Sequence, residues 1–244
     1  KDLKRKNLEY DVEEQKNKKV KVEENIEINN LNDLINLGEN IEVSDRDKYN
    51  FDITTLYYLV PSLKKLNEMI GMEKVKDNIV NQIIFHLQGL DNYNEHMMHT
   101  VIYGPPGVGK TELGKIMGEI YCDLGVLDFN DYSFHIMKRS DLIGRYLGET
   151  AIKTQEAIEK CKGGVMFIDE VYSLGNPEKK DSYSKECFDV LNQNLSENKS
   201  SFICIIAGYK ESVDKCFFAQ NEGLERRFPY RYEIDNYNAT ELQK

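Results

Sequence analysis

The sequence predicts an α/β fold, a doubly wound parallel sheet of five strands with helices on both faces. From residue 100 to about residue 234, short apolar runs alternate with stretches of helical pattern. Strands that are joined by crossover helices form a parallel sheet, because each crossover returns the chain to the same edge. The expected strands are 100–103, 133–137, 165–168, 202–207 and 230–234.

The segment before this region has a different composition. Residues 1–50 are rich in Lys, Glu and Asn and lack a sustained apolar period, which is typical of a charged, flexible arm. Within it, the leucines and isoleucines between Asn29 and Leu37 are compatible with one short helix. Residues 51–67 form a helical connector, in which Pro61 predicts a break or a new helix start.

An apolar stripe from Val75 to Leu87 predicts a helix over about residues 74–89. We assign the α/β domain to residues 68–236 and treat residues 237–244 as the start of a further segment.

The stretch Gly104–Thr111, which reads GPPGVGKT, is a phosphate-loop pattern. It follows the first expected strand and precedes a helical stretch that extends to about Tyr121. Glycines let the backbone wrap around an anion, and the helix N-terminus adds a partial positive charge. Lys110 is expected to reach the β- and γ-phosphates, and the Thr111 hydroxyl to coordinate Mg²⁺. The expected nucleotide-binding residues of this loop are Pro106, Gly107, Val108, Gly109, Lys110 and Thr111.

A second motif is the apolar run 165–168, which ends in Asp169 and Glu170. Taken alone it is a weak signal, because many strands end in solvated acids. The interval between Lys110 and Asp169 accommodates a helix, a strand and a second helix. We therefore expect the acid-tipped strand to lie beside the strand that carries the phosphate loop. Together the two motifs predict a nucleotide triphosphatase.

Composition bears on which other classes of protein are possible. The chain has 244 residues and a formal net charge of −10, which argues against a dedicated nucleic-acid binder. Its five cysteines are scattered without CxxC spacing, which favours a reducing compartment, and its four histidines form no zinc motif. No apolar run approaches the roughly 20 residues of a membrane span. We expect a protein of a reducing compartment such as the cytoplasm.

Four segments carry a resemblance to a known family. In residue types, order and spacing, these segments resemble those of the AAA+ ATPases, which are a class of P-loop NTPases. The resemblance is closer to the CbbX/SpoVK branch of that family. The four segments are Asp141–Ala151, Gly163–Leu174, Ile206–Lys210 and Asn221–Pro229. The resemblance covers about residues 68 to 236, and nothing before residue 67 carries it.

The resemblance implies roles at the γ-phosphate. Asp169 resembles the acid that holds Mg²⁺, and Glu170 the base that activates the attacking water. Arg227 lies at the position of the arginine finger, which reaches the nucleotide of a neighbouring subunit; Arg226 is the alternative. An arginine supplied across an interface implies a ring, usually a hexamer.

Further positions carry over from the same resemblance. Ile70 and Gly71 match the segment whose backbone recognises adenine, although Ile70 is equally compatible with core packing. Tyr146 and Leu147 occupy the central pore-loop position, where an aromatic followed by an aliphatic side chain grips extended polypeptide. The alternative is that Tyr146 packs on its own domain. Tyr209 occupies the sensor position, where many AAA+ proteins have Asn or Thr.

The function expected from these residues is an AAA+ motor core that hydrolyses Mg·ATP in a ring and pulls on a protein client. The CbbX side of the resemblance implies a red-type Rubisco as the client, with a plastid as the alternative to the cytoplasm. Two alternatives are an ATP-dependent assembly scaffold with little turnover and a DNA-acting AAA+ module. The intact catalytic residues oppose the first, and the missing basic pore segment opposes the second. The resemblance implies that a helical lid begins near the end of this chain. We therefore expect residues 237–244 to be the start of the lid, and the lid to be absent or truncated.

Overall fold

The computed structural model describes residues 26–42, 49, 51–90, 97–127, 132–146, 148–176, 178 and 181–243. The part of the predicted arm before residue 26 lies outside the described residues. The predicted five-stranded parallel sheet is confirmed. Its strands are β1 (Thr100–Tyr103), β2 (Phe134–Met137), β3 (Val165–Ile168), β4 (Ile203–Gly208) and β5 (Tyr230–Glu233).

The strand order is β2-β3-β4-β1-β5, so β4 separates β1 from β3. The expectation that the acid-tipped strand lies directly beside the phosphate-loop strand is therefore wrong. After β1 the chain crosses to β2 at the far edge and winds back through β3 and β4, which fills the place beside β1. In the register of the ladder, Ile102 of β1 pairs with Ala207 of β4, and Phe167 of β3 pairs with Ile205. Both motifs follow the carboxyl ends of their strands, and two strand spacings, about 10 Å, thus separate them.

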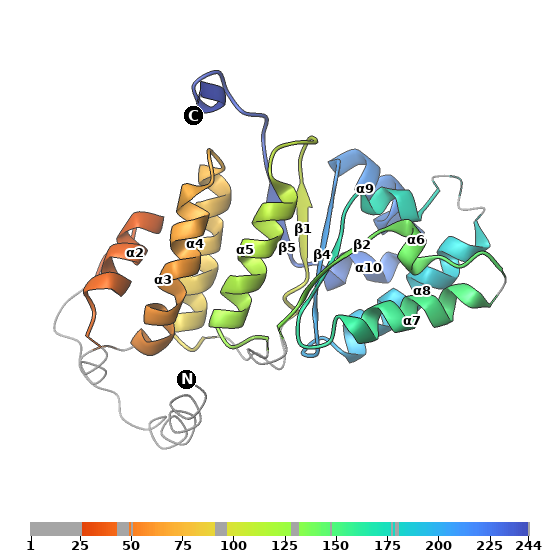
Figure 1. Cartoon of the computed structure of the whole chain (residues 1–244), viewed down its shortest axis with the longest axis horizontal. Coiled ribbons are helices and arrows are strands. Elements are labelled where there is room, and N and C mark those ends of the chain that lie inside the picture. The colour runs from red at the N-terminus through yellow and green to blue at the C-terminus, as the bar shows by residue number, and fades with distance from the viewer. Residues whose placement is uncertain are drawn as a thin grey trace, which may run out of the picture.

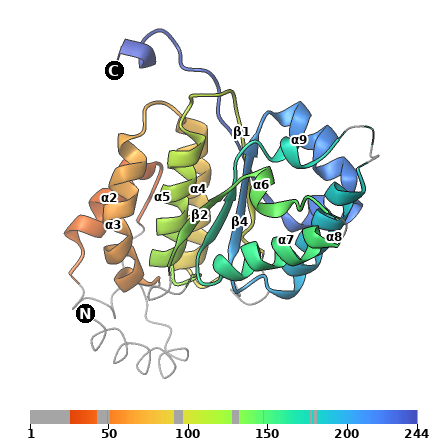
Figure 2. The same ribbon diagram turned by 45° about the vertical axis from the view of Figure 1, so that its right-hand side comes forward.

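Helices cover both faces of the sheet, as Figures 1 and 2 show. On one face lie α2 (Leu31–Asn40), α3 (Ile53–Glu68), α4 (Glu73–Leu87) and α5 (Lys110–Asp123). On the other lie α6 (Arg139–Leu142), α7 (Glu149–Lys160), α8 (Ser182–Glu197), α9 (Lys210–Cys216) and α10 (Glu222–Arg227). Short 3₁₀ turns in the described residues are η3 (Val171–Leu174), η4 (Phe218–Gln220) and η5 (Glu241–Gln243). None of the helices in the described ranges combines the length and apolar character that crossing a membrane requires.

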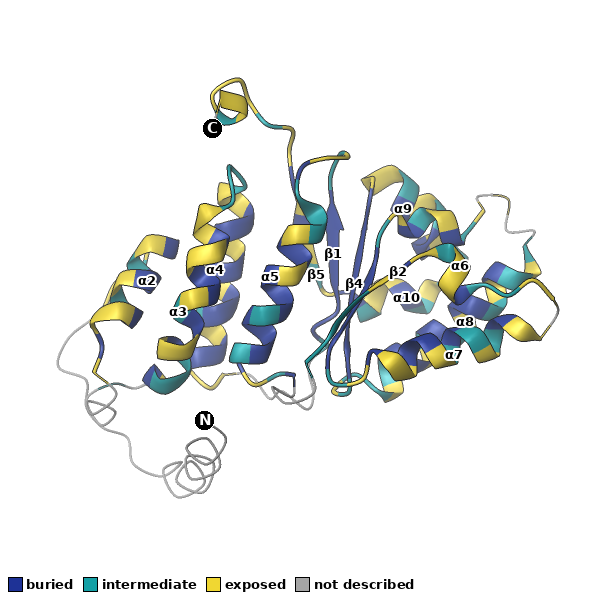
Figure 3. Cartoon of the chain, in the orientation of Figure 1, coloured by how far each residue is buried: buried dark blue, intermediate teal, exposed yellow. Residues whose placement is uncertain are grey.

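The sheet forms the centre of two apolar cores. Along β3, Val165 and Phe167 belong to the core under α2–α5, whereas Met166 and Ile168 belong to the core under α6–α10. This alternation leaves β1, β3 and β4 buried on both faces. Figure 3 shows β1 and β4 in the dark blue of buried residues. Apolar strands of this kind are expected where a parallel sheet is covered by helices on each side.

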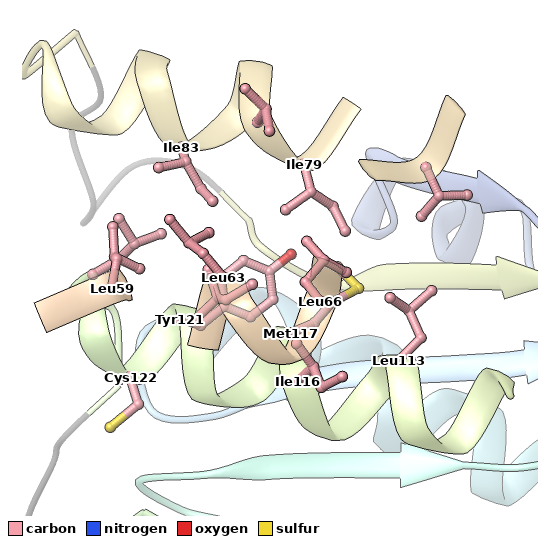
Figure 4. Close-up of a cluster of buried hydrophobic side chains, with 14 of the residues drawn as sticks. Leu59, Leu63, Leu66, Ile79, Ile83, Leu113, Ile116, Met117, Tyr121 and Cys122 are labelled. Carbon is pink, nitrogen blue, oxygen red and sulfur yellow. The ribbon is translucent and has the colours of Figure 1, made fainter. Parts of the chain in front are cut away.

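Helix α3 continues through Pro61, so the predicted break is wrong. The helix begins after Asp52, whose carboxylate accepts hydrogen bonds from the amides of Thr54 and Thr55 (both 3.0 Å). Pro61 lies on the exposed face, where water can hydrate the carbonyl that its missing N–H leaves free. The opposite face buries Leu59, Leu63 and Leu66 against α4 and α5 (Figure 4). At about 1.5–3 kcal/mol for each buried leucine, this burial outweighs a proline cost of about 3 kcal/mol.

The short helix expected between Asn29 and Leu37 forms as α2. The side chain of Asn30 caps it by accepting a hydrogen bond from the amide of Asp33 (3.0 Å). Leu31 and Leu34 are buried in the core shared with α3. This helix of the segment that we assigned to the arm is thus part of the packed layer.

His99, which precedes β1, is fully buried and serves the fold. Its Nδ1 accepts a hydrogen bond from the amide of Cys204 (3.0 Å), and its Nε2 lies 3.1 Å from the carbonyl oxygen of Leu195. Burial lowers the pKa of His99 to about 4, so the ring is neutral near pH 7 and Nε2 is the donor. The ring joins the start of β1 to β4 and α8.

Candidate nucleotide-binding site

The loop between β1 and α5 presents an anion-binding backbone. Gly107 and Gly109 have φ angles of 78° and 86°, in the left-handed region that glycine tolerates without a Cβ clash. Helix α5 begins at Lys110, directly after Gly109, which has no side chain to cap it. The first amides of α5 therefore stay open, and the helix dipole adds positive character there. This geometry favours a phosphate group.

A cavity of about 440 Å³ opens in front of this loop, at the edge where the strands end. Its walls come from the phosphate loop and the start of α5, the turn after β3, and the tip of β4. The sheet thus brings together residues that lie about 100 positions apart in the chain. The lining residues are Pro106, Gly107, Gly109, Lys110, Thr111, Glu112, Asp169, Glu170, Tyr172, Gly208 and Tyr209.

Lys110 is folded onto its own loop. Its Nζ donates hydrogen bonds to the carbonyl oxygens of Gly104 (3.0 Å) and Pro105 (2.6 Å). Burial lowers the pKa of Lys110, and the negative charges of Asp169 and Glu170 oppose that shift. The ammonium group therefore lies within the field of both acids, and a phosphate oxygen in the cavity would compete for it with the two carbonyl groups.

Asp169 and Glu170 follow β3 directly, as the sequence predicts. Glu170 has a φ of 47°, which places a non-glycine residue in the left-handed region. Its amide donates to Asp169 Oδ1 at 2.9 Å, so the Asp169 carboxylate is held against the backbone of Glu170. A conformation of this kind costs about 1–3 kcal/mol and is common at functional sites. Together with the Thr111 hydroxyl, Asp169 offers the hard oxygen ligands that Mg²⁺ prefers.

Two tyrosines line the cavity beside Glu170. Tyr209, the predicted sensor residue, lies at the end of β4, and its ring centroid is 6.1 Å from that of Tyr172. Burial raises the pKa of Tyr172, and a hydrogen bond to Glu170 and the charge of Glu170 raise it further. Sequence reasoning missed Tyr172, although its place two residues after Glu170 is a usable signal.

Ile70 and Gly71 lie in the link between α3 and α4. Gly71 has a φ of 69°. The flanking methyl groups of Met69 and Met72 lie 3.3 and 3.6 Å from the position that a Cβ on Gly109 would occupy. The link therefore contacts the phosphate loop. Ile70 and Gly71 themselves are not among the described residues that line the cavity, so their contact with adenine stays a prediction.

The two arginines of α10 lie away from the cavity. Arg227 donates from Nε to Ser196 Oγ (2.9 Å) and from a terminal nitrogen to the carbonyl of Gly223 (2.7 Å). Arg226 is exposed, and its side chain makes no hydrogen bond or ion pair with the described part of the chain. Since neither lines the cavity of its own chain, either one can act there only from a neighbouring copy.

Tyr146 belongs to the loop between α6 and α7. These two helices lie on the side of the sheet away from α5 (Figure 2). Its side chain is 74% exposed, so it does not pack on its own domain. The carboxylate of Glu149 accepts hydrogen bonds from the amides of Arg145 (2.7 Å) and Tyr146 (3.2 Å), which holds the loop in shape. Leu147, the second predicted pore-loop residue, lies outside the described residues.

A sequence profile of the ATPase family associated with various cellular activities (AAA) matches residues 100–234, which is more than half of the chain. The chain belongs to this AAA family. The match contains the phosphate loop, both acids and Arg227.

Three relatives place the chain within that family. A cfxQ-like protein of Acanthamoeba polyphaga mimivirus is 45% identical over 87% of this chain. Stage V sporulation protein K of Bacillus subtilis is 36% identical over 74%, and a CfxQ homolog of Trieres chinensis is 35% identical over 75%. These matches confirm a CbbX/SpoVK-like AAA+ ATPase. They cover 52%, 57% and 64% of the respective relatives, so the chain spans about half to two thirds of their length.

Proposed function

We propose that this protein binds and hydrolyses Mg·ATP and uses the cycle to pull on a protein client. The observation that carries the proposal is the cavity in which Lys110 meets Asp169 and Glu170 across one intervening strand. The open amides of α5 would hold the phosphates. Thr111 and Asp169 would hold Mg²⁺, which would supply positive charge against the phosphate oxygens.

The chemistry follows from the position of Glu170. Its carboxylate takes a proton from a water molecule while the water oxygen forms a bond to the γ-phosphorus. The bond between the γ-phosphorus and the bridging oxygen breaks, and ADP leaves with that oxygen. Tyr172 and Tyr209 border the same space and restrict where the water can sit.

Assembly completes the site in this proposal. The transition state needs a positive group close to the negatively charged γ-phosphate oxygens. Helix α10 can supply such an arginine only to the site of a neighbouring copy. This arrangement requires a closed ring, for which the family resemblance favours a hexamer.

The client in this proposal is a protein, gripped by the loop that carries Tyr146. An exposed tyrosine on a loop held by Glu149 offers apolar and stacking contact to extended chains without reading their sequence. The CbbX side of the branch makes a red-type Rubisco in a plastid or in the cytoplasm the specific candidate.

Lys110→Met tests the nucleotide site. Loss of the ammonium group removes its charge-assisted hydrogen bonds to the phosphates, so binding of a fluorescent ATP analogue is expected to weaken by about 100-fold. The matched control is Lys115→Met, an exposed lysine on the same helix that pairs with Glu112 (3.2 Å). Equal affinities of the two variants, measured by fluorescence titration, would show that the cavity is not the ATP site.

Tyr146→Ala tests the grip on the client. The parent protein, assembled into rings, is expected to hydrolyse ATP severalfold faster when carboxymethylated lactalbumin, an unfolded probe, is added. Tyr146→Ala is expected to lose that stimulation, because the exposed ring makes the contact. The control is Tyr57→Ala, because Tyr57 is also an exposed tyrosine but lies on α3. Stimulation by DNA instead of the polypeptide would contradict a protein client.

A further inference from the structure

Arg139, the first residue of α6, connects three separate elements. One terminal nitrogen donates to the carbonyl oxygens of Ser173 and Leu174 (both 2.7 Å) and lies 3.4 Å from Ser184 Oγ. The other donates to Asp181 Oδ2 at 2.8 Å. Asp181 is the N-cap of α8, and Ser173 and Leu174 end the turn η3.

The first connection concerns Glu170. Turn η3 follows Glu170 directly, and the amide of Ser173 donates to the carbonyl of Glu170 at 2.7 Å. Glu170 thus stands between β3, which is buried and rigid, and a single turn whose last two carbonyl groups Arg139 holds. Because Glu170 has an unfavourable backbone conformation, its direction depends on the anchoring of both ends.

The second connection concerns the loop of Tyr146. Helix α6 has four residues, and the loop starts at its end. Helix α7 holds this short helix in place: Thr154 Oγ1 donates to the carbonyl of Leu142 (2.8 Å), and Lys153 Nζ donates to that of Ser140. The amide of Ile143 donates back to the carbonyl of Arg139 at 2.9 Å. One helical turn thus connects Arg139 to the start of the loop.

We propose that Arg139 is a positioning residue that couples the Tyr146 loop to Glu170. It fixes the turn after Glu170 in the direction that activates water, and a load on the loop shifts that turn. The inference rests on the proposed function, since it needs Glu170 as the base and Tyr146 as the contact with the client. Arg139 does not line the cavity and acts only through η3.

Only arginine suits these contacts. Its planar guanidinium group carries five donors in a fixed fork, so two carbonyl groups and one carboxylate can be held at once. Lysine presents a point charge on a flexible stem and cannot reproduce both directions. The partners lie 34 to 45 residues from Arg139 in the chain, so no local sequence pattern announces them.

The test compares Arg139→Met, Arg139→Lys and the parent in assembled rings. We expect kcat for ATP hydrolysis to fall about tenfold in Arg139→Met, with the affinity for a fluorescent ATP analogue within twofold of the parent. Arg139→Lys is expected to recover less than half of the lost rate. The matched control is Lys64→Met, which breaks the ion pair with Glu39 between α2 and α3 (2.5 Å), far from Glu170.

A double-mutant comparison separates positioning from general damage. In a Glu170→Gln background the base is missing, so Arg139→Met is expected to change the residual single-turnover rate less than twofold. A tenfold loss in both backgrounds, or no loss in either, overturns the inference. If Arg139→Met does not fold by circular dichroism, Asp181→Asn removes the same ion pair and is expected to lower kcat in the same direction.

Coupling has its own readout. Stimulation by carboxymethylated lactalbumin is expected to disappear in Arg139→Met, as in Tyr146→Ala, although the probe still binds the ring. Full stimulation in Arg139→Met overturns the coupling. Failure of the proposed function and failure of the role of Arg139 give different results. A Glu170→Gln protein as active as the parent overturns the proposed function itself. An inactive Glu170→Gln protein beside a fully active Arg139→Met protein overturns only the role of Arg139.

Discussion

Glu170→Gln is expected to slow ATP hydrolysis by about 10²–10⁴-fold while ATP still binds. The amide has nearly the same shape as the carboxylate but cannot accept the proton of the attacking water. The phosphate loop, Lys110 and Thr111 are untouched, so the affinity for a fluorescent ATP analogue is expected to remain within a few-fold of the parent. Single-turnover hydrolysis and fluorescence titration measure the two quantities separately.

A matched control distinguishes a base from a mere negative charge. Glu112 also lines the cavity, but it lies on the first turn of α5 rather than at the end of β3. Glu112→Gln removes the same charge and is expected to change the rate less than threefold. Equal losses in the two variants would mean that the cavity needs acidity rather than a base at Glu170.

Much of this site could be predicted from the sequence because its parts are local. The glycines of the phosphate loop impose their own backbone conformation, and Lys110 and Thr111 follow at fixed spacing. Asp169 and Glu170 come at the end of a short apolar run, which favours a buried strand. Such features depend on neighbours within a few positions, so composition and spacing suffice to place them.

The features that were predicted wrongly or missed depend on distant partners. The position of β4 between β1 and β3 depends on which strands pair, and an apolar run does not encode its neighbour. Pro61 is tolerated because α4 and α5 bury the opposite face of α3. The contacts of Arg139 form only when η3 and α8 are packed around it. A sequence contains these relations, but they become visible only in the folded chain.

Arg226→Ala is expected to reduce turnover by about 10³-fold or more, the usual effect of removing an arginine finger. The family resemblance designates Arg227, but its guanidinium group is engaged by Ser196 and Gly223 of its own chain. We propose that Arg227 anchors α10 and that Arg226, which is exposed, reaches the γ-phosphate of the neighbouring copy. Arg227→Ala is then expected to lower the midpoint of thermal unfolding, whereas Arg226→Ala leaves it unchanged.

Mixed rings decide whether the arginine acts across an interface. Rings of Arg226→Ala subunits lack the finger, and rings of Glu170→Gln subunits lack the base, so each alone is expected to be inactive. In a mixture, an Arg226→Ala site with an intact Glu170 can receive Arg226 from a Glu170→Gln neighbour, and turnover is expected to reappear. Arg226→Ala, Glu170→Gln double-mutant subunits are the control, because they supply neither group. If Arg227→Ala subunits are complemented in this way and Arg226→Ala subunits keep full activity, the finger is Arg227.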